Sequence, residues 1–62
     1  MSEQEAINRA YAETVETIFK VFFGEFTSAK GSPNAEQGAK DRFQTGIVHA
    51  RHARDVALAL LP

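Results

Sequence analysis

Apolar side chains recur at spacings of three and four residues through the first half of the chain. The recurring positions are Ile7, Tyr11, Val15, Ile18, Phe22, Phe26 and Ala29. This spacing is typical of an amphipathic helix that turns one apolar stripe towards a neighbour. Phe19 and Phe23 widen the stripe in its second half. The pattern therefore predicts a helix whose apolar surface is too wide for one neighbouring helix to cover.

A second seam with the same spacing runs through the last 30 residues, but its side chains are small. Its members are Ala39, Phe43, Gly46, Ala50, Ala53, Ala57 and Leu60, and five of these seven are Ala or Gly. Small residues let another backbone approach closely and leave room for larger side chains opposite. Ile47, Leu58 and Leu61 add apolar surface on one flank. We therefore expect a second helix that packs its small side chains against the aromatic helix.

The first helix has recognisable start and stop signals. Ser2 followed three residues later by Glu5 has the form of a capping box, in which both side chains satisfy free backbone N–H groups. Lys30 places a cation at the negative end of the helix dipole, and Gly31 can adopt the left-handed conformation that closes a helix. These signals predict a helix over about residues 3–30.

The second helix is expected to begin almost immediately. Ser32 is a good N-cap, and Pro33 suits the first helical position because proline has no N–H to lose there. A helix over about residues 33–61 would follow a turn at about 31–32. Because the link is so short, the two helices must fold back as an antiparallel hairpin.

The chain is too small to build a large core. It has 62 residues, enough for a single domain over 1–62, and no cysteine to form a disulfide. Two helices alone would leave part of each apolar stripe in water, so we expect an all-α hairpin that dimerises into a four-helix bundle. The residues expected at the oligomer interface are Ile18, Phe19, Phe22, Phe23, Phe26, Phe43, Ile47, Ala50, Ala53 and Ala57.

In length and topology this architecture resembles that of the Rop family, plasmid-encoded RNA-binding proteins in which a short two-helix chain also forms a four-helix bundle. The resemblance is one of architecture alone, since no sequence motif is shared. The first hypothesis for function is a self-associating module for protein–protein interaction or scaffolding, which acts as a homodimer either alone or with another protein. The second is a nucleic-acid-binding hairpin dimer.

Composition favours the first hypothesis. The formal net charge is −1, with three basic and five acidic residues in positions 1–30 and four and three in 31–62. The opening segment MSEQEAINRA lacks a basic region followed by an apolar run, so we expect no secretory signal and a cytoplasmic location. No apolar stretch is long enough to span a membrane.

Nucleic-acid binding would depend on the cations of the second helix. Lys40, Arg51 and Arg54 are expected on one shoulder of the small-residue seam, and dimerisation would double this set. Glu13 and Glu16 are expected close enough to neutralise arginines across the hairpin. The alternative is that the long basic side chains lie along the bundle with their charges in water.

His49 and His52, in the stretch HARHAR, raise the third hypothesis, a metal-binding bundle. Two histidines three residues apart on a helix can reach one ion, but a catalytic zinc needs a third protein ligand, and no Glu-x-x-His pair is present. A turn at residues 31–32 would place His52 opposite Tyr11. We expect surface histidines, no metal and no cofactor.

Enzymatic chemistry has no support in the sequence. It contains no Ser/His/Asp set, no cysteine nucleophile, no glycine-rich phosphate loop and no inward pair of carboxylates, so we expect no enzyme. Gly24 is unexplained, because a glycine within a helix costs up to about 1 kcal/mol relative to alanine and this one lies opposite the apolar stripe.

Overall fold

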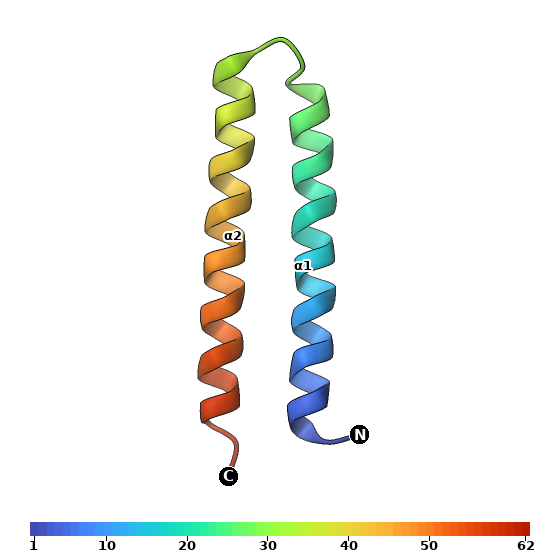
Figure 1. The fold of residues 1–62 in the computed structure, drawn as a ribbon, viewed down its shortest axis with the longest axis vertical. Coiled ribbons are helices and arrows are strands. Elements are labelled where there is room, and N and C mark those ends of the chain that lie inside the picture. Colours follow the sequence, from blue (N-terminus) through green and yellow to red (C-terminus); the bar gives the residue numbers. More distant parts are fainter.

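The computed structural model describes all 62 residues and consists of two antiparallel helices (Figure 1). Helix α1 spans Glu3–Ser28 and helix α2 spans Pro33–Ala59, and there is no strand. The prediction of an all-helical, two-helix hairpin is confirmed. Dimerisation into a four-helix bundle stays a prediction.

Both helices begin where their capping residues indicate. The Ser2 hydroxyl accepts a hydrogen bond from the Glu5 N–H at 3.1 Å, and it also lies 3.2 Å from the Glu5 carboxylate, to which it donates. The carboxylate thus binds the serine side chain, whereas a full capping box would have it accept from the serine backbone N–H. At the second start, the Ser32 hydroxyl accepts from the Ala35 N–H at 3.4 Å, with Pro33 in the first turn.

Each helix ends two residues before the predicted position. Helix α1 is closed by Ala29, whose N–H donates to the Glu25 carbonyl, and the chain then turns through Gly31 at a φ of +85°. The left-handed glycine was predicted, but it lies within a four-residue turn and not directly after the last helical residue. The longer turn shifts the register between the helices, so that Tyr11 lies against Arg54 and not against His52.

Aromatic and small side chains alternate along the contact between the two helices. The rings of Phe22 on α1 and Phe43 on α2 have centroids 4.9 Å apart. A Cβ atom at Gly46 would lie 3.4 Å from Ile18 Cγ2, so glycine lets this isoleucine side chain lie directly against the backbone of α2. The small-residue seam therefore makes room for the bulky side chains of α1.

Two members of the predicted seam do not lie between the helices. Ala53 is exposed, and Leu60 is 77 % exposed because α2 has ended before it. The other five members are buried or half-buried. A strict alternation of four and three residues averages about 3.5 residues per turn, so its positions drift around a straight helix of 3.6 residues per turn. This drift places Ala53 on a flank of the contact between the helices.

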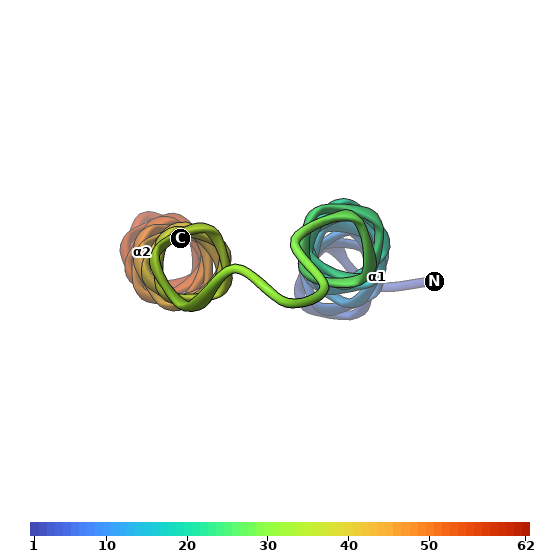
Figure 2. The same ribbon diagram turned by 90° about the horizontal axis from the view of Figure 1, so that it is seen from above.

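The hairpin is a single layer of helix with both faces open. Its Cα atoms extend over 49 × 18 × 6 Å, and seen from above the two helices lie side by side with no third element over either face (Figure 2). Only Ala29 and Ala39 are buried, with 8 % and 0 % of their surfaces exposed. No side chain larger than a methyl group is enclosed.

Candidate interaction surface

One face of the hairpin carries most of the large apolar side chains and is called here the aromatic face. It consists of Phe19, Phe22 and Phe26 from α1 with Phe43 and Ile47 from α2. The Phe22 ring lies 5.2 Å from that of Phe26 and 6.5 Å from that of Phe19, measured between centroids, with tilted planes. Tilted aromatic pairs at these distances are favourable beyond their buried area. Residues from both helices thus form one continuous apolar patch.

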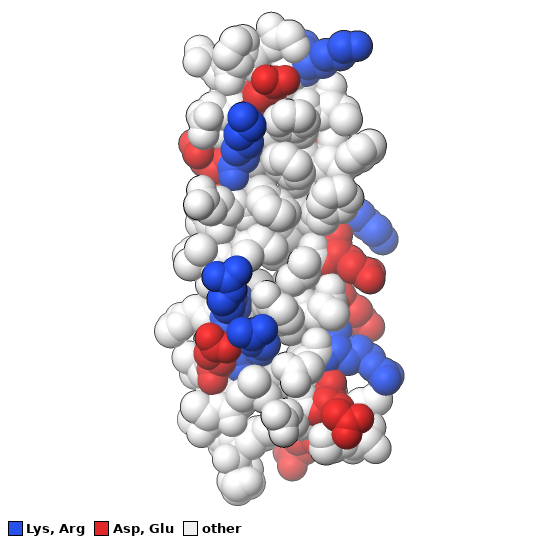
Figure 3. All heavy atoms as spheres, viewed as in Figure 1, with Lys and Arg blue, Asp and Glu red and all other residues white.

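The aromatic face includes a shallow hollow of about 430 Å³. Phe22, Phe43, Ile47 and Val48 line it together with Lys40 and Arg51. The Lys40 ammonium lies 6.0 Å from the centroid of the Phe26 ring. Figure 3 shows this face, with uncharged atoms along its middle, basic and acidic side chains along the outer edge of α1, and further basic and acidic side chains over the front of α2. The surface is an apolar band between two charged margins.

The opposite face is lined mainly by smaller side chains and is called here the alanine face. Ala50, Ala53 and Ala57 of α2 form a hollow of about 230 Å³ with Ile7 and Tyr11, among others, of α1. A second hollow of the same size lies nearer the turn and includes Ile18, Val21 and Gly46. Apolar area is therefore present on both faces, but the phenylalanines concentrate it on one.

The structure divides the predicted interface residues between these two faces. Phe19, Phe22, Phe26, Phe43 and Ile47 come together on the aromatic face. Ile18, Ala50 and Ala57 lie in the contact between the helices and border the alanine face, where Ala53 is also found. Phe23 is largely exposed, with its ring 6.2 Å from that of Phe19.

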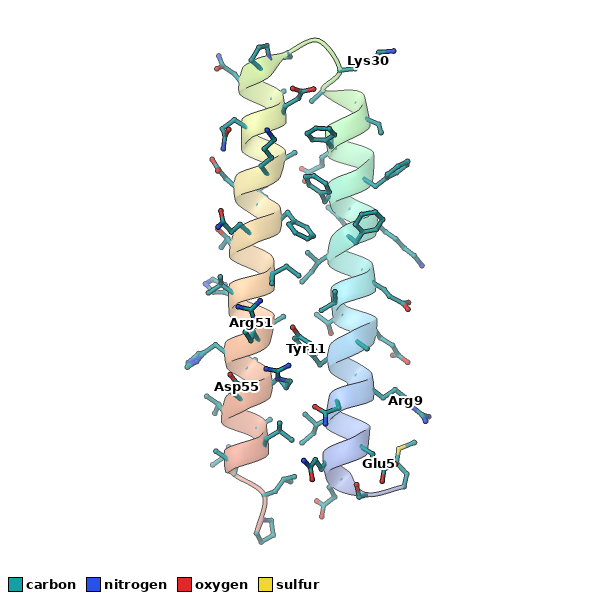
Figure 4. The ribbon with its side chains drawn as sticks, in the orientation of Figure 1. Glu5, Arg9, Tyr11, Lys30, Arg51 and Asp55 are labelled. Atoms are coloured by element: carbon teal, nitrogen blue, oxygen red, sulfur yellow. The ribbon has the colours of Figure 1, made fainter.

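The three cations considered for nucleic-acid binding differ in their surroundings. Arg54 donates to the Asp55 carboxylate at 2.9 and 3.0 Å, and its guanidinium carbon lies 4.4 Å from the centroid of the Tyr11 ring. Lys40 lies over Phe26, while Arg51 makes no ion pair. Figure 4 shows Arg51 and Asp55 on α2 and Tyr11 on α1, pointing towards α2. Two of the three cations are therefore engaged within the chain.

The two histidines lie away from the contact between the helices. Both are exposed, and His49 borders a shallow surface hollow with Gln44, Thr45 and Val48. No group of three or more His, Cys, Asp or Glu side chains is arranged to hold a metal ion.

Two contacts were missed by sequence reasoning. Arg42 Nε donates to the Glu25 carboxylate at 2.9 Å and makes the ion pair that crosses the hairpin, whereas Glu13 and Glu16 pair with no arginine of the chain. The second is the stacking of Arg54 on Tyr11. Charge and aromatic character marked these residues as candidates, but the pairing depended on the register between helices.

Neither helix is long and apolar enough to cross a membrane. Comparison of the chain with protein families, with curated proteins and with solved structures finds no match.

Proposed function

We propose that this protein is a self-associating interaction module that works as a homodimer, with the aromatic faces of two hairpins packed together into a four-helix bundle. Each hairpin supplies the missing layer of the other. One surface patch serves both copies, which is the economical solution for a two-fold dimer.

The observation that carries this proposal is the absence of an enclosed core. Only Ala29 and Ala39 are buried among 62 residues. Hydrophobic burial is the main favourable contribution to folding, and two buried methyl groups with a set of half-buried side chains offset little of the conformational entropy of ordering two long helices. A covering partner would bury the phenylalanines and isoleucines that the single hairpin leaves half-buried.

The exposed area supports the same proposal. The hairpin exposes 4738 Å², whereas a compact monomer of 6.8 kDa is expected to expose about 4,000 Å². Stable protein interfaces bury about 800 Å² on each partner, close to this excess. Monomeric proteins rarely present a large contiguous apolar patch, and here one spans both helices in the half of the hairpin nearer the turn.

The aromatic face is the better interface of the two. Phenylalanine side chains bury far more apolar area than alanines, and aromatic residues are enriched in the cores of protein interfaces. Its margins carry charged side chains that can remain in water at the rim of the contact. On the alanine face a partner would remove little apolar area from water for each residue it covers, so the stabilisation gained there would be small.

Solution mass measured over a range of concentrations tests the dimer. We expect twice the chain mass at tens of micromolar and a thermal midpoint that rises with concentration, because association is coupled to folding. A monodisperse monomer with a concentration-independent midpoint would contradict the proposal.

A matched pair of variants tests which face is used. Phe19 on the aromatic face and Val21 on the other side of the same helix are similarly exposed, at 52 % and 57 %. Phe19→Glu should abolish dimerisation, because it would bury a carboxylate at the interface. Val21→Glu, which introduces the same charge, should leave the dimer intact. Equal effects of the two changes would show that the aromatic face is not the interface.

A further inference from the structure

We infer that the two hairpins stack with their turns at the same end of the bundle, so that α1 of one copy lies against α2 of the other. This orientation rests on the proposed dimer through the aromatic face. It is selected by two ion pairs between copies, Glu16 with Arg51 of the partner subunit and Arg9 with Asp55 of the partner subunit.

Only two arrangements stack the same face of two hairpins around a two-fold axis with their helices aligned. An axis parallel to the helices places α1 on α2 of the partner, with both turns at one end. An axis across the helices places α1 on α1 and α2 on α2, with the turns at opposite ends. The apolar band allows either arrangement, so the charged margins must select between them.

The register within one chain fixes which residues share a height along the bundle. Phe22 lies opposite Phe43, and Arg54 lies over Tyr11. Residues at the same height on the two helices therefore have numbers that add up to about 65, each residue step being about 1.5 Å. By this rule Arg51 lies at the height of residue 14, and Asp55 at the height of residue 10.

With the turns at the same end, the outer margin of α1 lies against the outer margin of the partner's α2 at equal height. Along the bundle axis, the height of Glu16 then differs by about 3 Å from that of Arg51 of the partner subunit. The height of Arg9 differs by about 1.5 Å from that of Asp55 of the partner subunit. Figure 4 shows Arg9 on the outer side of α1, with Arg51 and Asp55 on α2. In each pair the two side chains carry opposite charges.

Helical geometry places Glu16, Arg9 and Asp55 at the margins of the aromatic face, whereas Arg51, one turn after Ile47, also lines its hollow. At 100° per residue, Glu16 and Arg9 lie on the outer side of the stripe that contains Phe19 and Phe26. All four are exposed, and Glu16, Arg9 and Arg51 make no ion pair within the chain. Asp55 binds Arg54 through Oδ1. Its second carboxylate oxygen makes no hydrogen bond within the chain.

With the turns at opposite ends, each margin meets a copy of itself. Glu16 is at the middle of α1, which spans Glu3–Ser28, so it would lie beside Glu16 of the partner subunit. The basic margin of α2, with Lys40 and Arg51, would face the same margin of the partner subunit. Like charges at an interface disfavour an arrangement more than unlike charges favour it, because both lose hydration without gaining a partner.

Charge reversal at the central pair tests the orientation through the dimer dissociation constant. Glu16→Arg and Arg51→Glu should each weaken the dimer roughly tenfold, since the pair occurs twice in each dimer. The double variant should return the constant to within about threefold of the parent, because the pair is restored with its charges exchanged. Glu13→Arg changes the net charge equally, one turn away on the outer edge, and serves as the matched control.

A distance between copies provides an independent measurement. The chain has no cysteine, so Lys30→Cys in the turn gives a single attachment site for a spin label. Turns at the same end should place the two labels within about 25 Å, the width of a bundle with helix axes about 10 Å apart. Turns at opposite ends should place them about 40 Å apart or more.

The outcomes separate this orientation from the proposed dimer. A dimer with unchanged affinity in Glu16→Arg, a tighter dimer in Glu16→Gln, or labels 40 Å apart would overturn the same-end orientation and leave the dimer standing. A protein that stays monomeric, with no distance between labels in any sample, would overturn both. Circular dichroism of each variant at equal concentration confirms that the helices are retained.

Discussion

The two ends of the hairpin are held together by different means. Near the turn, between Ile18 and Ile47, the helices are joined by the Phe22–Phe43 contact, by the Arg42–Glu25 ion pair and by the two buried alanines. This region is called here the turn half. In the terminal half, residues 3–15 and 49–59, alanines of α2 meet Ile7 and Tyr11, and Arg54 covers the tyrosine ring.

The difference shows how one contact between two helices can carry unequal energies along its length. Apolar area removed from water contributes about 25 cal/mol per Å², and a phenylalanine offers several times the area of an alanine. The turn half therefore supplies most of the stabilisation. The terminal half permits close approach and contributes less, so it should exchange its amide protons first.

Truncation of Phe22 should have the largest effect, because this ring contacts Phe26 and Phe43 and lines hollows on both faces. Phe22→Ala is expected to lower the free energy of unfolding by about 3 kcal/mol, measured by urea denaturation at fixed protein concentration. Phe23→Ala, at an exposed neighbouring position, should cost less than half as much. Similar losses in the two variants would show that the phenylalanine cluster is not the main source of stability.

Enlarging the alanines should distinguish the contact in the terminal half from its flank. Ala50 is half-buried between the helices, so Ala50→Leu should destabilise by about 1 to 3 kcal/mol through overpacking. Ala53 is exposed, and Ala53→Leu should change stability by less than about 0.5 kcal/mol. The same denaturation measurement checks both. A destabilised Ala53→Leu would place this residue inside an interface between copies.

Alanine substitutions at two glycines of the turn half should change the stability of the protein in opposite directions. A Cβ atom at Gly24 would meet nothing within 4 Å, so Gly24→Ala should stabilise the protein by up to about 1 kcal/mol through helix propensity. Gly31 has a φ of +85°, so Gly31→Ala should destabilise by roughly 1 to 2 kcal/mol. Thermal midpoints at equal concentration provide the measurement. Loss of stability in Gly24→Ala would indicate a partner on the outer side of α1.

Changing both histidines should have the smallest effect. His49 and His52 are exposed in the terminal half, so replacing both by glutamine should alter the free energy of unfolding by less than about 0.5 kcal/mol. A chelator should not change the thermal midpoint of the parent protein. A chelator-sensitive midpoint, lost in the double variant, would instead support the metal hypothesis.

Much of the fold could be predicted from the sequence because its determinants are local. The helix starts follow from Ser2 and Ser32, whose hydroxyls need only the N–H groups three residues ahead. The left-handed turn follows from Gly31, and the amphipathic stripe of α1 follows from spacing alone. Each helix was predicted to end two residues beyond its actual end. The end of a helix depends on which N–H groups of the turn bind the last free carbonyls, and this is not determined by local sequence.

The sequence by itself determined two amphipathic helices, an antiparallel hairpin and an excess of apolar surface, since each depends on residues a few positions apart. Only the tertiary structure decided which side chains meet across the hairpin. Because the turn is two residues longer than predicted, Arg54 lies against Tyr11 in place of His52. In the same register Arg42 pairs with Glu25, and Glu16 and Arg51 have no ion-pair partner within the chain. The physical reason is that register between helices depends on turn length, and one residue of slip moves a side chain about 1.5 Å along the axis and 100° around it.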